Sequence, residues 1–172
     1  SSEKFNMLKP YIQISEAFRR KQDTLHFIKK AEKDTLAVYK YPEGTLVDLN
    51  EADTTELKKI PGIGSGIARM IVAYRKRLGG FYDMAQLKEV NYVDEDMLRW
   101  FKLGNAPIHR INANKAGLDK LRSHPYMNFY QAKVIIEYRR KKGKLKSLSQ
   151  LSLYEEFTEK DLERLSHYLA FD

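Results

Sequence analysis

The sequence predicts an all-α fold made of two tandem four-helix units. Three observations support this prediction. Pro61-Gly62-Ile63-Gly64 makes a tight turn between two amphipathic helical patterns. The same pattern returns when residue n is placed over residue n + 64, and helix caps recur at matching places in both copies. A helix, a tight turn and a second helix form a helix-hairpin-helix, so each copy is predicted to hold two such hairpins back to back, as in small SAM-like helical domains.

The repeat appears as identities in one register. The pairs are Asn50/Asn114, Ala52/Ala116, Leu57/Leu121, Pro61/Pro125, Ala68/Ala132, Ile71/Ile135, Tyr74/Tyr138, Arg75/Arg139, Gly79/Gly143, Gln86/Gln150, Leu87/Leu151 and Leu98/Leu162. Chance gives far fewer identities at average composition. We therefore predict one helix-hairpin-helix repeat over 47–107, which holds the Pro-Gly-Ile-Gly hairpin, and a degenerate one over 108–172.

Each predicted helix has its own start and stop signals. In the first copy these are Asp53 with Glu56, Gly79-Gly80, Asp83 with Gln86, and Asp94 at the start of a fourth helix that carries Leu98, Trp100 and Phe101. In the second copy they are Gly143, Ser147 with Gln150, and Thr158 before Leu162 and Leu165. The long helices place Tyr74 and Tyr138 on their apolar stripes, which predicts core positions for both.

The region before the repeats is predicted to have two parts. Residues 1–14 look like the tail of a truncated upstream helix-hairpin-helix repeat, with Leu8 and Tyr11 in the place of Leu98 and Phe101. Residues 15–46 are predicted to form one helix, to about residue 31, and then an irregular connector that ends in Tyr41-Pro42-Glu43-Gly44.

Composition favours a polyanionic partner and gives no support for catalysis. The 172 residues carry a net charge of +8 and are 42% hydrophobic, which is enough for a packed core. The chain has no cysteine, so disulfides and thiolate metal sites are excluded. Its four histidines lack metal-ligand spacing, and no catalytic constellation is recognisable, so we expect a protein that is not an enzyme and has no metal. A membrane anchor would have to lie outside this sequence.

The glycine turn is the predicted phosphate-binding site. Gly62 and Gly64 lack a Cβ and tolerate positive φ, so an anion can approach the backbone closely. The amides of Ile63 through Gly66 are predicted to lack intrahelical partners, and the helix dipole adds positive charge there. The predicted contact residues are Pro61, Gly62, Ile63, Gly64, Ser65 and Gly66, with Lys59 and Arg69 beside them. The other three hairpins lack these glycines and are predicted to bind phosphate poorly.

Two basic runs form an auxiliary set. They are Arg75, Lys76 and Arg77 in the first copy and Arg139, Arg140, Lys141, Lys142 and Lys144 in the second. Bound to DNA, such cations release counterions and make the affinity depend steeply on salt. Unbound, they complement the negative end of their helix in water, and the sequence leaves both interpretations open.

The string VDLNEADTTELKKIPGIGSGIARMIVAYRKRLGGFYDMAQLKEV, residues 47–90, resembles the ComEA family of bacterial competence proteins. The resemblance implies a non-catalytic module that binds double-stranded DNA without sequence preference, through hairpin amides on phosphates. It further implies a place outside the bacterial inner membrane, DNA-uptake proteins as partners and no small-molecule substrate. Related hairpins also hold a monovalent cation on carbonyls near Ile60 and Ile63.

Two other functions stay open at this stage. The first is a helical protein-interaction scaffold whose hairpins are vestigial and whose basic faces meet an acidic partner. The second is an accessory DNA-binding domain of a repair enzyme. Without the competence role, the expected location of the chain is the cytoplasm.

Overall fold

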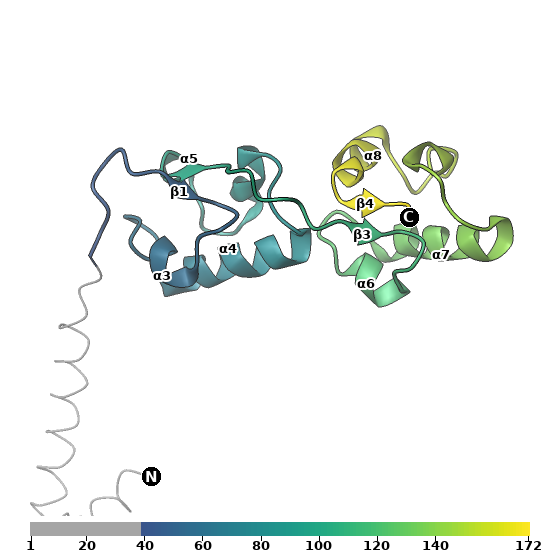
Figure 1. Cartoon of the computed structure of the whole chain (residues 1–172), viewed down its shortest axis with the longest axis horizontal. Coiled ribbons are helices and arrows are strands. Elements are labelled where there is room, and N and C mark those ends of the chain that lie inside the picture. Colours follow the sequence, from purple (N-terminus) through teal and green to yellow (C-terminus); the bar gives the residue numbers. More distant parts are fainter. Residues whose placement is uncertain (1–38) are drawn as a thin grey trace, which may run out of the picture. The chain divides into compact units, whose positions relative to one another are not determined.

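The structure is a computed structural model that describes residues 39–172 (Figure 1). The tail predicted for residues 1–14 and the helix predicted from residue 15 to about 31 lie outside the described residues. Lys40–Asp172 form one compact unit. Within this unit the two repeats follow one another along the chain.

The predicted all-α, tandem-repeat fold is confirmed. The first repeat contains β1 (Val47–Asp48), α3 (Thr54–Leu57), α4 (Ser65–Leu78), the 3₁₀ helix η2 (Met84–Glu89), α5 (Glu95–Leu98) and β2 (Phe101–Lys102). The second contains β3 (Ile111–Asn112), α6 (Leu118–Arg122), α7 (Phe129–Lys142), the 3₁₀ helix η3 (Leu148–Gln150), α8 (Glu159–Ser166) and β4 (Leu169–Ala170).

The predicted capping signals are present. Asp53 with Glu56, Asp83 with Gln86, and Ser147 with Gln150 each form a reciprocal capping box. α4 ends at Leu78, and Gly79 follows it in the left-handed conformation with φ of 92°. Local sequence therefore predicts where these helices start and where α4 ends.

The fourth helix of the first repeat is shorter than predicted. α5 ends at Leu98, so the prediction that this helix carries Trp100 and Phe101 is wrong. Both residues are buried, but Phe101 lies in β2 and pairs with Val47 of β1 in a parallel bridge. The second repeat closes in the same way, because Ile111 of β3 pairs with Leu169 of β4. These bridges join the entry of each repeat to its exit.

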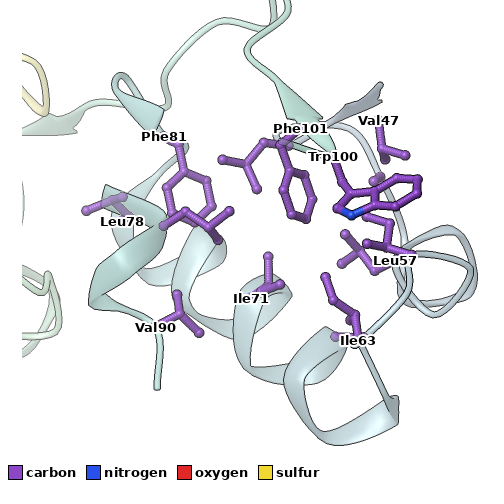
Figure 2. Packing of buried hydrophobic residues seen from close by; sticks show 14 of the residues in the cluster. Val47, Leu57, Ile63, Ile71, Leu78, Phe81, Val90, Trp100 and Phe101 are labelled. Atoms are coloured by element: carbon purple, nitrogen blue, oxygen red, sulfur yellow. The ribbon is translucent and has the colours of Figure 1, made fainter. Parts of the chain in front are cut away.

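Each repeat has its own hydrophobic core. In the first repeat, Leu57 and Ile63 point into the same cluster as Ile71, Trp100 and Phe101 (Figure 2). The second core is built from the corresponding helices and includes Leu121, Met127, Ala132, Ile135 and Tyr138. Tyr138 is buried as predicted, whereas Tyr74 is half-buried and its hydroxyl donates to the Glu89 carboxylate.

The repeats meet through a cluster that we call the inter-repeat cluster: Gln86, His124, Tyr126 and Tyr168. The Gln86 amide nitrogen donates to the hydroxyls of Tyr126 and Tyr168, each at 2.8 Å. The Tyr168 hydroxyl donates to the carbonyl of Gly80 at 2.9 Å, and His124 Nε2 lies 3.0 Å from the carbonyl of Leu78. Because His124 and Tyr126 belong to the first hairpin of the second repeat, that hairpin is used for packing.

Candidate nucleic-acid interface

The first hairpin turn, residues 60–64, has a buried side that packs in the core and a side exposed to solvent. Ile60 and Ile63 are fully buried, and the Ile63 amide donates to the Ile60 carbonyl at 3.2 Å. Gly62 has φ of 83°, as the third position of a type II turn requires. A Cβ at Gly62 would also lie 3.1 Å from the Met97 methyl carbon. This glycine is therefore needed for the fold of the turn.

The Ile63 hydrogen bond corrects one prediction. The amide of Ile63 was expected to be free for a phosphate, but it closes the turn. The free donors of the hairpin therefore begin one residue later than predicted. They are the amides of Gly64, Ser65 and Gly66.

These three amides begin helix α4. Gly64 is the N-cap, with φ of −96° and ψ of 178°, and it has no side chain to accept a hydrogen bond. Within residues 39–172 the amides of Gly64, Ser65 and Gly66 have no acceptor, and all three residues are exposed. A Cβ built at Gly64 or Gly66 would meet nothing within 4 Å. Free amides at a helix N-terminus, with the helix dipole behind them, favour an anion.

The other three hairpins close with the same hydrogen bond but have a different cap. In each, the fourth residue of the turn donates to the first: Val93 to Val90, Met127 to His124, and Phe157 to Tyr154, at 3.1 to 3.2 Å. Their N-cap side chains accept from the next helix: Asp94 from Met97 at 3.0 Å, Asn128 from Gln131 at 2.9 Å, and Thr158 from Asp161 at 3.2 Å. A phosphate at these hairpins would have to displace the protein's own cap.

The third hairpin is also covered. His124 is buried against the first repeat, and Nδ1 of its ring accepts from the Tyr126 amide at 3.2 Å. The Tyr126 hydroxyl donates to Glu89 of the first repeat at 2.8 Å. The Arg164 guanidinium lies 4.7 Å from the Tyr126 ring centroid and pairs with Glu89 at 3.6 Å. This hairpin is therefore used within the protein.

Two of the predicted basic neighbours lie at the first hairpin. Arg69 Nε donates to the Ser65 carbonyl at 3.2 Å, which places its exposed guanidinium beside the first turn of α4. Lys59 is half-buried, and its ammonium lies 5.6 Å from the ring centroid of Tyr41. Arg69 is therefore placed to add positive charge beside the open amides, whereas the Lys59 ammonium is directed to the Tyr41 ring.

Two members of the auxiliary basic set have a structural role instead. Arg75 donates to the carbonyls of Leu49 and Ala52 at 2.9 and 2.8 Å, and burial lowers the pKa of its guanidinium. Arg139 donates to the carbonyl of Ala116 at 2.6 Å. Both hold a long helix to the segment that precedes it. Their repetition in the sequence therefore reflects the fold.

The remaining auxiliary residues are at the surface. Lys76, Arg140 and Lys144 are exposed, and exposed Arg77 donates to the Ser123 carbonyl at 3.4 Å. Lys141 pairs with Glu137 at 3.4 Å, and Lys142 lies over the rings of Tyr138 and Tyr154 at 5.5 and 5.8 Å. A role in binding DNA stays a prediction for these residues.

The sequence analysis missed Lys40. Its ammonium lies against the first hairpin, within hydrogen-bonding distance of the carbonyls of Lys58, Ile60 and Ile63. The residue belongs to the predicted irregular connector, where no periodicity indicates which segment it contacts. Only the folded chain brings it to the hairpin.

A model of the helix-hairpin-helix motif family matches the chain twice, over residues 43–100 and 107–170. The chain belongs to the helix-hairpin-helix motif family. Motifs of this kind support nucleic-acid binding as its function. The finer resemblance to the competence proteins has no such support.

The chain is also similar to vertebrate proteins named endonuclease/exonuclease/phosphatase family domain-containing protein 1. The mouse (Mus musculus) protein is 27% identical over 154 residues, an alignment covering 70% of this chain and 27% of the relative. The zebrafish (Danio rerio) protein is 28% identical over 127 residues, covering 61% and 23%. The chain thus spans about a quarter of the length of these relatives.

No solved structure matches the chain significantly. Among the helices of residues 39–172, none has the length and apolar character needed to cross a bilayer.

Proposed function

We propose that the chain binds double-stranded DNA without sequence preference, and that the amides of Gly64, Ser65 and Gly66 hold a backbone phosphate. The observation that carries this proposal is the open start of α4. The N-caps of the other three hairpins have a side chain bonded to the following helix, whereas the N-cap of α4 is an exposed glycine. Arg69 adds charge beside it.

Phosphate contacts fix position on the duplex without reading sequence. We therefore expect fluorescently labelled duplexes of unrelated sequence to bind with equal affinity. The logarithm of the binding constant should fall linearly with the logarithm of the salt concentration. Absence of binding at low salt up to roughly 100 μM would instead favour the interaction scaffold, because nonspecific DNA binders usually reach that range.

Replacing Gly64 with valine tests the hairpin itself. The backbone of Gly64 is in the β region, which valine adopts readily, and its Cβ meets no protein atom. The side chain would cover the open amides, so we expect Gly64→Val to weaken duplex binding about tenfold, or about 1.4 kcal/mol. Removal of one exposed charge with Lys76→Met should weaken it less.

The matched control is Gly117→Val. Gly117 is the glycine N-cap of α6, with a similar backbone conformation and no atom within 4 Å of a built Cβ, but it does not belong to a hairpin turn. Both variants lose the same kind of cap, so their thermal midpoints should fall alike. Equal losses of DNA affinity in the two variants would contradict the hairpin proposal.

A second candidate function is that of a DNA-binding module within a larger protein. It is favoured by the vertebrate relatives, whose name includes an endonuclease/exonuclease/phosphatase domain and of which this chain covers about a quarter. The repeats themselves would be non-catalytic, so incubation of the chain with duplex and Mg²⁺ should leave the DNA intact. A role in DNA uptake, as the resemblance to competence proteins implies, is the alternative cellular setting for the same module.

A further inference from the structure

The Lys40 ammonium lies among three carbonyl oxygens of the first hairpin. Its Nζ is 2.6 Å from the oxygen of Lys58, 3.1 Å from that of Ile60 and 3.3 Å from that of Ile63. A lysine ammonium has three donors and no acceptor, so this arrangement gives each donor one carbonyl. The three oxygens come from a single turn and form a site for one positive charge.

The chain around Lys40 is fixed to the same turn. The amide of the next residue, Tyr41, donates to the Lys59 carbonyl at 2.8 Å. Tyr41 packs against the first core, and Lys59 lies over its ring. The connector therefore holds the ammonium at the hairpin through its backbone as well as through its charge.

Carbonyl clusters of this kind bind monovalent cations because the oxygens replace the hydration shell of the ion. The resemblance described above implies such an ion near Ile60 and Ile63. A metal ion does not fit beside Lys40, since the ammonium already contacts all three oxygens. We infer that Lys40 is the resident cation of the first hairpin, and that this hairpin needs no free monovalent metal ion.

Lys40 also acts on the open amides, a step that depends on the proposed DNA-binding function. The Ile63 carbonyl and the Gly64 amide belong to the same peptide group. A positive charge on the oxygen polarises that group and makes its N–H a stronger donor. Lys40 is thus placed to position the turn and to strengthen the donor closest to the phosphate.

The arrangement is particular to this hairpin. At n + 64 from Lys40 the second repeat has Gly104. Within residues 39–172, no side chain donates to the carbonyls of Arg122, His124 or Met127, which correspond to those of Lys58, Ile60 and Ile63. In the second hairpin of the first repeat, the nearby Lys88 ammonium pairs with the Glu95 carboxylate at 2.6 Å and not with the hairpin carbonyls. The tethered cation accompanies the one hairpin whose amides are open.

The test uses the 172-residue chain without DNA, so it is independent of the proposed function. Thermal unfolding is measured for wild type, Lys40→Met and the exposed control Lys160→Met in KCl, NaCl and tetramethylammonium chloride of equal ionic strength. We expect the wild-type and control midpoints to be the same in all three salts. The Lys40→Met midpoint should fall by roughly 2–4 °C in tetramethylammonium, which is too large for the site. K⁺ or Na⁺ should restore it in a concentration-dependent way.

Three outcomes would overturn the inference. They are a wild-type midpoint that rises in K⁺, a Lys40→Met midpoint equal to that of Lys160→Met in every salt, and a loss that no monovalent cation restores. Should Lys40→Met fail to fold, the inference is tested on the wild-type chain by NMR of its ¹⁵N-labelled lysine ammonium groups. A slowly exchanging Lys40 ammonium signal supports the inference, and exchange as fast as that of Lys160 refutes it.

Discussion

Asn50 and Asn114 show why certain residues recur in the two repeats. Each side chain makes a pair of hydrogen bonds with the backbone of one residue after the long helix: Asn50 with Phe81, and Asn114 with Leu145, at 2.8 to 2.9 Å. Arg75 and Arg139 likewise both donate to preceding carbonyls. The candidate site, in contrast, depends on Gly64, which has no counterpart in the second repeat. Shared residues maintain the fold, and the differing ones determine which hairpin is open.

His124 gives a prediction at the scale of one residue. Burial lowers the pKa of its imidazole to about 4, against an ordinary value of 6.5. The unfolded chain therefore binds the proton first as pH falls. The contribution of neutral His124 to the free energy of unfolding should therefore be complete above pH 6.5. It should be lost between pH 6.5 and pH 4, which lowers stability by roughly 3 kcal/mol.

The measurement is thermal unfolding between pH 7 and pH 4. Carboxylates also titrate near the lower end, so the quantity to compare is the wild-type midpoint minus that of His124→Asn. This difference should shrink as pH falls. The exposed His109→Asn variant should follow wild type at every pH. A constant difference between wild type and His124→Asn would show that His124 is not held neutral.

At the scale of elements, caps were predictable and ends were less so. Asp53, Asp83, Ser147 and Thr158 were read correctly as caps because a cap depends on residues only three apart. The predicted end of α5 was wrong because Phe101 leaves the helix to pair with Val47, a contact across nearly the whole repeat. The second repeat reaches the equivalent bridge after a longer helix, with α8 spanning eight residues and α5 four. Such differences in length follow from tertiary pairing.

The candidate site divides in the same way. The Pro-Gly-Ile-Gly turn was found from local sequence, because φ of 83° at Gly62 is a local requirement. The role of Lys40 and the covering of the third hairpin depend on contacts between segments far apart in the chain. No local pattern in the sequence carries that information.

The second hairpin gives a prediction at the scale of elements. Its N-cap, Asp94, begins α5. This helix lies next to the first hairpin, as shown by the closeness of its Met97 to a Cβ built at Gly62. The Asp94 carboxylate repels a phosphate there. Asp94→Asn keeps an oxygen for the cap and removes the charge, so duplex affinity at low salt should rise about threefold, with a small change in stability.

Titration of labelled duplex at two salt concentrations checks this prediction. Glu159→Gln removes an exposed carboxylate from the first turn of α8; it is the control and should change affinity less. The gain from Asp94→Asn should diminish as salt rises, because exposed charges are screened. Weaker binding by Asp94→Asn at low salt would indicate that this carboxylate supports the DNA-binding face.

At the scale of the whole molecule, the inter-repeat cluster makes the two repeats interdependent. Gln86 caps η2 with its oxygen, which accepts from the amides of Tyr82 and Asp83, and reaches the second repeat with its nitrogen. Tyr168 lies directly before β4 and closes the second repeat while it bonds the first. Separation of the repeats would expose these buried polar groups and their rings. The second repeat therefore stabilises the repeat that carries the open hairpin.

This coupling predicts that both repeats unfold together. Trp100, the single tryptophan of the chain, is buried in the first core, and Met127 is buried in the second. Tryptophan fluorescence and the ¹³C-methyl signal of Met127 should therefore give the same thermal midpoint in wild type. Tyr168→Phe removes the hydrogen bonds to Gly80 and Gln86, so both midpoints should fall, by roughly 2–8 °C for about 1–2 kcal/mol. Tyr154→Phe, whose hydroxyl makes no hydrogen bond within residues 39–172, should stay close to wild type. Separate midpoints for the two probes in wild type would show that the repeats fold independently and that the inter-repeat cluster does not couple them.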